Sequence, residues 1–272
     1  MRTTTLRRLA TAGALSLVAV GGAVALSATP AFAASSQVSV VHGIPGQPVD
    51  VYVNGKRTLE NFQPGDVAGP LSLAEGDYDI ALTKPGEEID QAVLKVDNAA
   101  VPGGANISLV AHLSAQGDPK ITPFVNDTSK LDPGQARLIV RHTAAAPAVD
   151  VRAGGKPVFE DLTNPNEAKA DLAAGTVSAD VVLAGTDTVV LGPTDLNLKE
   201  GTATIVYAIG SAENDTLDVV AQTIDGLHSS PGGVPSGSGG RADAGLAAGW
   251  YAVAAMGLLL LAFGTRRVLA VR

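Results

Sequence analysis

The stretch that decides the fold is residues 41–56, VHGIPGQPVDVYVNGK, because residues 141–156 read RHTAAAPAVDVRAGGK. A histidine, a Val-Asp-Val triplet, a turn dipeptide and a lysine recur in the same register. Recurrence at a fixed long offset marks a duplicated structural unit. The sequence therefore predicts two tandem domains of one fold, over residues 34–130 and 131–227.

Local patterns inside the repeat favour strands. Residues 49–53, VDVYV, alternate apolar and polar side chains, as a strand with one face on a core requires. The dipeptide Asn54-Gly55 follows, and Gly154-Gly155 follows in the second copy. Both tolerate the positive φ of a two-residue type I′ turn, so each copy is expected to contain a β-hairpin here.

Further strands are expected where apolar and β-branched residues gather between Gly and Pro clusters. They are residues 38–41, 78–82, 92–96, 107–112, 137–141, 177–183, 188–191 and 202–209. A short helical turn is expected only near residues 166–172. The predicted fold class is all-β, with two tandem antiparallel β-sandwich (Ig-like) domains.

The N-terminus has the three parts of an export signal. Arginines precede an apolar run over residues 9–26, and an Ala-Phe-Ala site follows. Residues 1–33 are predicted to be a signal peptide, cleaved between Ala33 and Ala34. The pair Arg7-Arg8 leaves twin-arginine export open, although the residues after it favour general secretion.

The C-terminus predicts a membrane anchor. Residues 246–263 form an uncharged apolar run that would span about 27 Å as a helix. The expected order is a Gly/Ser/Pro linker over 228–244, a transmembrane helix over 245–264 and a cytoplasmic tail over 265–272. Arginines in that tail place the C-terminus inside and the ectodomain outside. With no Leu-Pro-x-Thr-Gly motif in the sequence, retention in the plasma membrane rather than in the cell wall is expected.

Charge and cysteine content exclude several classes of function. Residues 34–245 contain all 27 acidic residues and 13 of the 19 basic ones, a formal net charge of −14. Nucleic acid is an unsuitable partner for such a surface, since phosphate backbones need a basic footprint. The chain has no cysteine, which rules out disulfides, thiol nucleophiles and cysteine-based metal sites.

The repeat supplies the candidate binding residues. His42 precedes Asp50 by eight residues, and His142 precedes Asp150 by the same spacing. Imidazole and carboxylate could bind a metal or act as an acid–base pair. Alternatively, each histidine hydrogen-bonds the loop that follows it.

The two aspartates also have a structural alternative, in which Asp50 and Asp150 pair across their hairpins with Lys56 and Lys156. Acidic groups at residues 75–79 and 87–90 lack the spacing of a calcium loop. No Gly-x-Ser-x-Gly or Ser-x-x-Lys motif occurs, so no catalytic residue, cofactor or metal is predicted.

The motif Val-His-Gly-x-Pro-x-x-x-Val-Asp-Val-Tyr-Val-Asn-Gly of residues 41–55 resembles proteins with domain of unknown function 4397, which are common in actinobacteria. The resemblance extends over about residues 36–227. The second copy departs from the motif at Thr143, Ala144 and Arg152. The resemblance implies β modules on a cell surface and implies no enzymatic activity.

Two functional hypotheses follow. The first is a membrane-anchored extracellular protein with a non-catalytic binding or structural role, whose partner is an envelope protein or polymer. The second is an extracellular enzyme or metal-dependent sensor that uses His42, His142 and nearby carboxylates.

Overall fold

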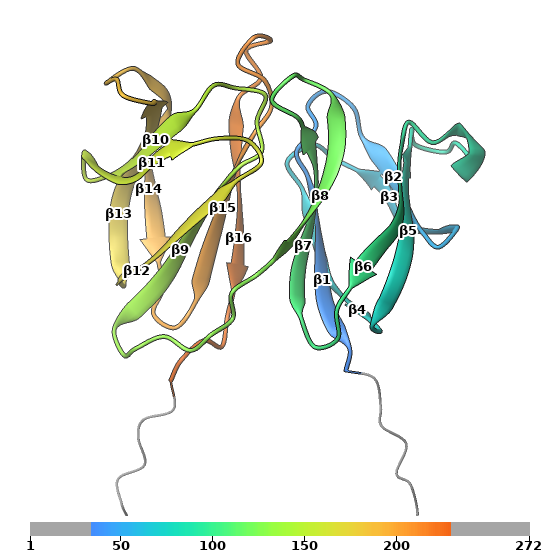
Figure 1. The fold of residues 1–272 in the computed structure, drawn as a ribbon, viewed down its shortest axis with the longest axis horizontal. Helices are drawn as coiled ribbons and strands as arrows, with labels where there is room; N and C mark the ends of the chain where they lie inside the picture. The colour runs from blue at the N-terminus through green and yellow to red at the C-terminus, as the bar shows by residue number, and fades with distance from the viewer. Residues whose placement is uncertain (1–33, 230–272) are drawn as a thin grey trace, which may run out of the picture.

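The structure, a computed structural model, describes residues 34–229 as two successive groups of eight strands (Figure 1). The first group, called here the first module, also contains the 3-10 helix η1 (Ile89–Gln91). Its strands are β1 (Ser36–His42), β2 (Val49–Val53), β3 (Lys56–Phe62), β4 (Val67–Leu73), β5 (Gly76–Thr83), β6 (Leu94–Val101), β7 (Asn106–Leu113) and β8 (Pro119–Val125). The second module has β9 (Gln135–His142), β10 (Val149–Ala153), β11 (Lys156–Leu162), β12 (Glu167–Ala173), β13 (Gly175–Leu183), β14 (Val189–Leu198), β15 (Ala203–Ile209) and β16 (Asp218–Ile224).

Each module consists of two four-stranded sheets with the same topology. The outer sheets have the order β3-β2-β5-β6 and β11-β10-β13-β14, and the inner sheets β4-β1-β7-β8 and β12-β9-β15-β16. The all-β class is confirmed. The purely antiparallel arrangement is wrong, because β1 pairs with β7, and β9 with β15, in parallel. Between the two strands of each pair, the chain passes through the outer sheet and returns to the same end of the inner sheet. The two strands therefore run in the same direction.

Each module has a core between its own two sheets. In the first module the core includes Val38, Val51, Ile80 and Leu109, and in the second it includes Leu138, Val149, Val151 and Leu198. The alternation of residues 49–53 accounts for this placement, because Val49 and Val51 face inward from β2.

A third apolar cluster joins the two modules. Val41 and Val110 of the first inner sheet pack with Ile139, Ile205 and Tyr207 of the second. The inner sheets are thus buried on both faces, and the four sheets lie side by side as four layers (Figure 1). Strands buried on both faces read as nearly continuous apolar runs, which explains the sequence Ala-Thr-Ile-Val-Tyr-Ala-Ile of β15.

The sequence predicted the central strands but missed four edge strands, β4, β8, β12 and β16. Residues 166–172, expected as a helical turn, lie almost entirely in β12, which pairs with β9 along seven residues. Pairing with a buried strand outweighs the helix preference of Ala, Glu and Lys. Both hairpins are confirmed, with positive φ at Asn54, Gly55, Gly154 and Gly155.

The two ends of the described chain leave from the same end of the molecule (Figure 1). The loops that end β1, β7, β9 and β15 lie at the opposite end, which we call the far end. His228 is expected in the linker, yet it forms a β-bridge with Leu131 of the second module. The predicted signal peptide, most of the linker, the membrane helix and the tail lie outside the described residues. Within residues 34–229, no helix has the length and hydropathy needed to cross a bilayer.

Candidate functional site

The two repeated histidines end the equivalent strands β1 and β9, and both are 1% exposed. In the first module, His42 Nε2 lies 2.9 Å from the carbonyl oxygen of Gln47. The second module repeats this contact, with His142 Nε2 2.9 Å from the carbonyl oxygen of Pro147. Each ring therefore ties the end of its strand to the loop that follows, which is the structural alternative predicted from sequence.

The other ring nitrogen differs between the copies. His42 Nδ1 accepts a long hydrogen bond of 3.4 Å from the backbone N–H of Ile44. His142 Nδ1 is buried with no hydrogen-bond partner among the described residues. Burial lowers the pKa of both histidines below the ordinary value, so both imidazoles are neutral at pH 7.

The two repeated aspartates also bind their own backbone. Asp50 is 2% exposed, and its carboxylate accepts hydrogen bonds from the N–H groups of Asn61 at 2.7 Å and Gly86 at 2.9 Å. Asp150 accepts the corresponding bonds from Asp161 at 2.8 Å and Gly185 at 2.9 Å. Each carboxylate thus fastens β2 or β10 to two neighbouring strand ends. These bonds lower the pKa of Asp150 below its ordinary value.

The predicted cross-strand pairing of these aspartates with lysine is wrong. Lys56 lies opposite Val53 in the hairpin, and Lys156 lies opposite Ala153. Each lysine therefore lies opposite the residue three positions after the aspartate, and not opposite the aspartate itself. The cation closest to Asp50 is Arg57, whose Nε lies 3.5 Å from the carboxylate.

The structure does not join the histidines and aspartates into one site. His42 and His142 lie on inner sheets, whereas Asp50 and Asp150 lie on outer sheets. Across residues 34–229, no three His, Asp or Glu side chains are grouped as a metal site would require. The two histidines donate from Nε2 to loop carbonyls, and the two aspartates accept from backbone N–H groups, so all four side chains fix loops.

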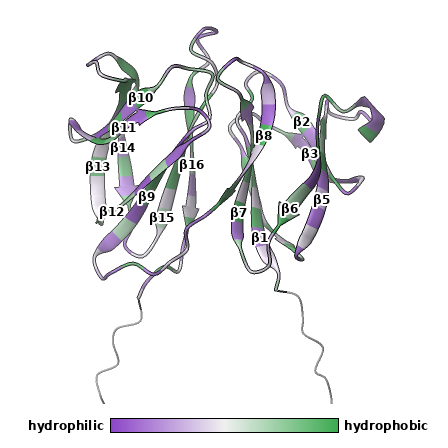
Figure 2. Ribbon diagram, viewed as in Figure 1, coloured by the Kyte–Doolittle hydropathy of each residue, from purple (hydrophilic) through white to green (hydrophobic). Residues whose placement is uncertain are grey.

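The more elaborate polar cluster lies between the modules and was missed by the sequence analysis. Arg141 of β9 has no exposed surface, and its guanidinium donates to Glu167 at 2.8 Å, Tyr207 at 2.9 Å and Asn126 at 2.7 Å. It also lies over the ring of Phe124, 4.4 Å from the centroid. Figure 2 shows polar residues interrupting the apolar ones along β9.

Ser108 of the first module and Gln222 of the second complete this cluster. Ser108 Oγ donates to Gln222 Oε1 at 2.9 Å, and Tyr207 donates to the same oxygen at 2.7 Å. Asn126 donates to Ser108 at 3.0 Å. Two of these bonds cross between the modules, Arg141 to Asn126 and Ser108 to Gln222, and together they favour one relative placement of the two sheets. Burial raises the pKa of Tyr207, so its hydroxyl stays a donor.

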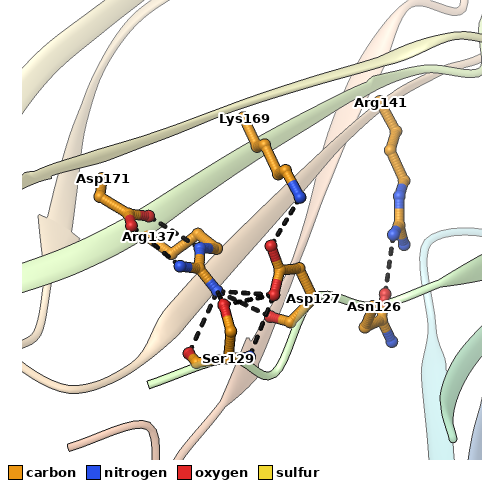
Figure 3. A network of polar contacts seen from close by, with 7 residues as sticks. All are labelled: Asn126, Asp127, Ser129, Arg137, Arg141, Lys169 and Asp171. Carbon is orange, nitrogen blue, oxygen red and sulfur yellow. Dashed lines mark hydrogen bonds and ion pairs between the residues drawn. The ribbon is translucent and has the colours of Figure 1, made fainter. Parts of the chain in front are cut away.

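The connection between the modules is held by a second set of charges (Figure 3). Arg137 pairs with Asp171 through two hydrogen bonds, at 2.7 and 2.8 Å. Its third nitrogen reaches the Asp127 carboxylate at 3.0 Å and Ser129 Oγ at 2.9 Å. Lys169 donates to Asp127 from the other side, and this bond lowers the pKa of that carboxyl far below its ordinary value. The short joint between the modules is thus bonded to β9 and β12.

A sequence signal for this cluster existed in the arginines of β9. The sequence of β9 is Gln-Ala-Arg-Leu-Ile-Val-Arg-His. Arg137 and Arg141 lie on the face that a strand buried on one side only would expose to solvent. Both are nearly or fully buried. The pattern of one strand cannot show that its polar face meets a second module.

Comparison with known proteins gives a family match over part of the chain and a weak similarity to solved structures. Residues 36–152 match the model of the family named Domain of unknown function (DUF4397). This match covers the first module and the beginning of the second. No curated protein matches the chain.

Among solved structures, one similar chain is described as a "putative cell adhesion protein" from Bacteroides ovatus ATCC 8483. The similarity covers 73% of this chain and 99% of that one, at 11% sequence identity and a TM-score of 0.23. A similarity of this degree supports no statement about function.

Proposed function

We propose that this protein is a non-catalytic, extracellular double β module, anchored in the plasma membrane, that binds or spaces components of the cell envelope. The observation that supports this proposal best is that the repeated polar residues form hydrogen bonds with the backbone. The residues that sequence analysis singled out as chemical, His42, Asp50, His142 and Asp150, are engaged by backbone groups of their own module.

The contact between the modules supports the same proposal. A single-module binder would gain nothing from the buried Arg141 cluster, whereas a protein that presents a surface of fixed shape would. The ends of the described chain lie at one end, and the loops that end β1, β7, β9 and β15 lie at the other (Figure 1). With the C-terminal helix in the membrane and the tail inside, the far end would point away from the cell.

The partner class in this proposal is an envelope protein or polymer, and nucleic acid is excluded by the charge of −14 over residues 34–245. No metal or cofactor is required. The competing hypothesis, a metal-dependent sensor or enzyme, needs His42 and Asp50 free to bind a ligand, and both have backbone partners.

The test uses the full-length protein, purified from membranes, immobilised and exposed to isolated envelope of the same cells. We expect saturable binding of an envelope component, and protease treatment of intact cells should digest the modules. Elemental analysis of the same preparation separates the alternatives. A stoichiometric metal that disappears in His42→Ala, or modules protected from external protease, would overturn the proposal.

A further inference from the structure

The two modules differ at one side of the sandwich, between the last strand of the inner sheet and the last strand of the outer sheet. The registers make β8 and β16 equivalent. Ile121 of β8 lies opposite Ala111, and Val219 of β16 lies opposite Ala208. Those two alanines are in turn the parallel partners of His42 and His142. Ile121 and Val219 therefore occupy the same position in the two copies.

This position is closed in the first module and open in the second. Ile121 is 8% exposed and belongs to the core, whereas Val219 is 40% exposed. Val219 lines a cavity of about 60 Å³ with Val140, Val206, Leu191 and Leu196. By this measure one water needs about 10–15 Å³, so the cavity has room for about four atoms, the size of a leucine side chain.

The strand that borders this opening has an unprotected edge. Within the described part of the chain, β16 pairs with β15 alone and is the last strand of its sheet. Its equivalent β8 has Pro123 where β16 has Ala221, as their partners Leu109 and Val206 show. Proline is tolerated in a strand where its nitrogen faces away from the neighbouring strand, so the N–H of Ala221 also faces away from β15.

One further observation agrees with that orientation, and a second concerns the opposite border of the opening. The N–H of Val219, two residues before Ala221, bonds to the carboxylate of Asp218 at 2.8 Å rather than to β15. The opposite border, β14, contains Gly192-Pro193, and proline is a common protection of strand edges. The first module thus blocks this edge with proline, while the second leaves β16 open beside an apolar cavity.

We propose that the free edge of β16 and the cavity beside it bind an extended segment of a partner protein, which adds as a fifth strand to the inner sheet of the second module. Backbone groups of Ala221 and Thr223 would pair with the segment, as in other cases of strand addition. Side chains of a strand alternate between its two faces, so a leucine-sized residue at one position would enter the cavity. The partner segment therefore has apolar residues two apart.

This inference rests on the proposed binding role and names the class of its partner. The probe is a phage-displayed library of random twelve-residue peptides, selected on the full-length protein. We expect enriched peptides with apolar residues at alternate positions, and Ala221→Pro should lower their affinity at least tenfold. The matched control is Val125→Ala, which removes an exposed valine from the proline-protected strand β8 and should change affinity less than twofold.

Val219→Asp provides a second variant at an exposed position, in case Ala221→Pro does not fold. It should lower peptide affinity at least fivefold, with the melting temperature unchanged. Enriched peptides that bind both variants as well as the wild type, or no enrichment at all, would overturn the inference. Self-association of the full-length protein that Ala221→Pro abolishes would also overturn it, since the occupant would be a second copy. If envelope binding persists in Ala221→Pro, the proposed function stands and only this site is wrong.

Discussion

At the scale of single residues, both copies of the repeat hold their loops in place with the same contacts, although the surroundings of the two copies differ. His42 and His142 each bond a loop carbonyl, and Asp50 and Asp150 each bond two backbone N–H groups. The same residue types often mark reactive sites. Here the hydrogen bonds of all four side chains are to the backbone of the same module, and Asp50 also pairs with Arg57.

The buried histidines give the protein a pH-dependent stability. Burial lowers the pKa of His42, His112 and His142 in the folded state. Below about pH 6.5 the unfolded chain takes up protons that the folded chain does not. The free energy of unfolding should therefore fall as the pH drops from 7 to 5, by up to about 1.4 kcal/mol per pH unit for each histidine. Urea unfolding at several pH values measures this, and His112→Gln should reduce the slope. An unchanged stability between pH 7 and 5 would contradict it.

Asp50 offers a test of the backbone clamp. Asp50→Ala leaves the N–H groups of Asn61 and Gly86 without their acceptor, and we expect a loss of about 2–4 kcal/mol in the free energy of unfolding. Asp50→Asn keeps one acceptor oxygen and should lose less. Chemical denaturation measures both, and exposed Glu60→Ala is the control. Equal losses for Asn and Ala would show that the hydrogen bond retained by Asn contributes nothing to stability.

At the scale of strands, the sequence predicted what lies within one module better than what lies between modules. The alternation of residues 49–53 and the turn at Asn54-Gly55 are local signals, and the strand and the turn that they predict were both confirmed. Asp50 and Tyr52 on the predicted polar face are nevertheless buried. The edge strand β12 was missed because Glu-Ala-Lys-Ala-Asp-Leu-Ala has weak strand preference and depends on pairing with β9.

The roles of the candidate residues could be predicted only as alternatives. Whether His42 binds a loop carbonyl or a ligand depends on the position of Gln47, which spacing alone does not fix. The Arg141 cluster could not be predicted from the sequence. Asn126, Glu167 and Tyr207 are distant along the chain, and they come together when the strands of the inner sheets pair and the sheets pack face to face.

The middle apolar layer should carry as much stability as the cores. Ile205 of β15 has no exposed surface and packs in the cluster between the modules. Ile205→Ala should cost about 2–5 kcal/mol, similar to Leu138→Ala in the second core. Thermal unfolding of both variants compares them. A loss below about 1 kcal/mol at Ile205 would mean that the modules pack loosely.

At the scale of the whole molecule, the two modules form a four-layered body whose middle contact combines an apolar cluster with the buried Arg141 cluster. Removing one partner of a buried charged cluster is costly, often about 3–5 kcal/mol. The buried cluster therefore couples the unfolding of one module to that of the other.

We expect the wild-type protein to show one calorimetric unfolding transition for both modules. Arg141→Ala should lower the transition temperature and separate it into two, because the modules lose their main polar contact. Arg152→Ala is the control, since it removes the ion pair between Arg152 and Asp180, which lies within the second module. Two transitions in the wild type would contradict the coupling.

The placement of both described chain ends opposite the far loops also determines how the molecule would carry mechanical load. A pull between the far end and residue 229 runs along β15 and β16, which are joined by seven consecutive residue pairs. Hydrogen bonds between antiparallel strands are perpendicular to the strands, so such a pull loads all of them together in shear. The second module would resist that force as a unit, whereas a pull that separates the two adjacent strand ends at the open end of a hairpin would break one bond at a time.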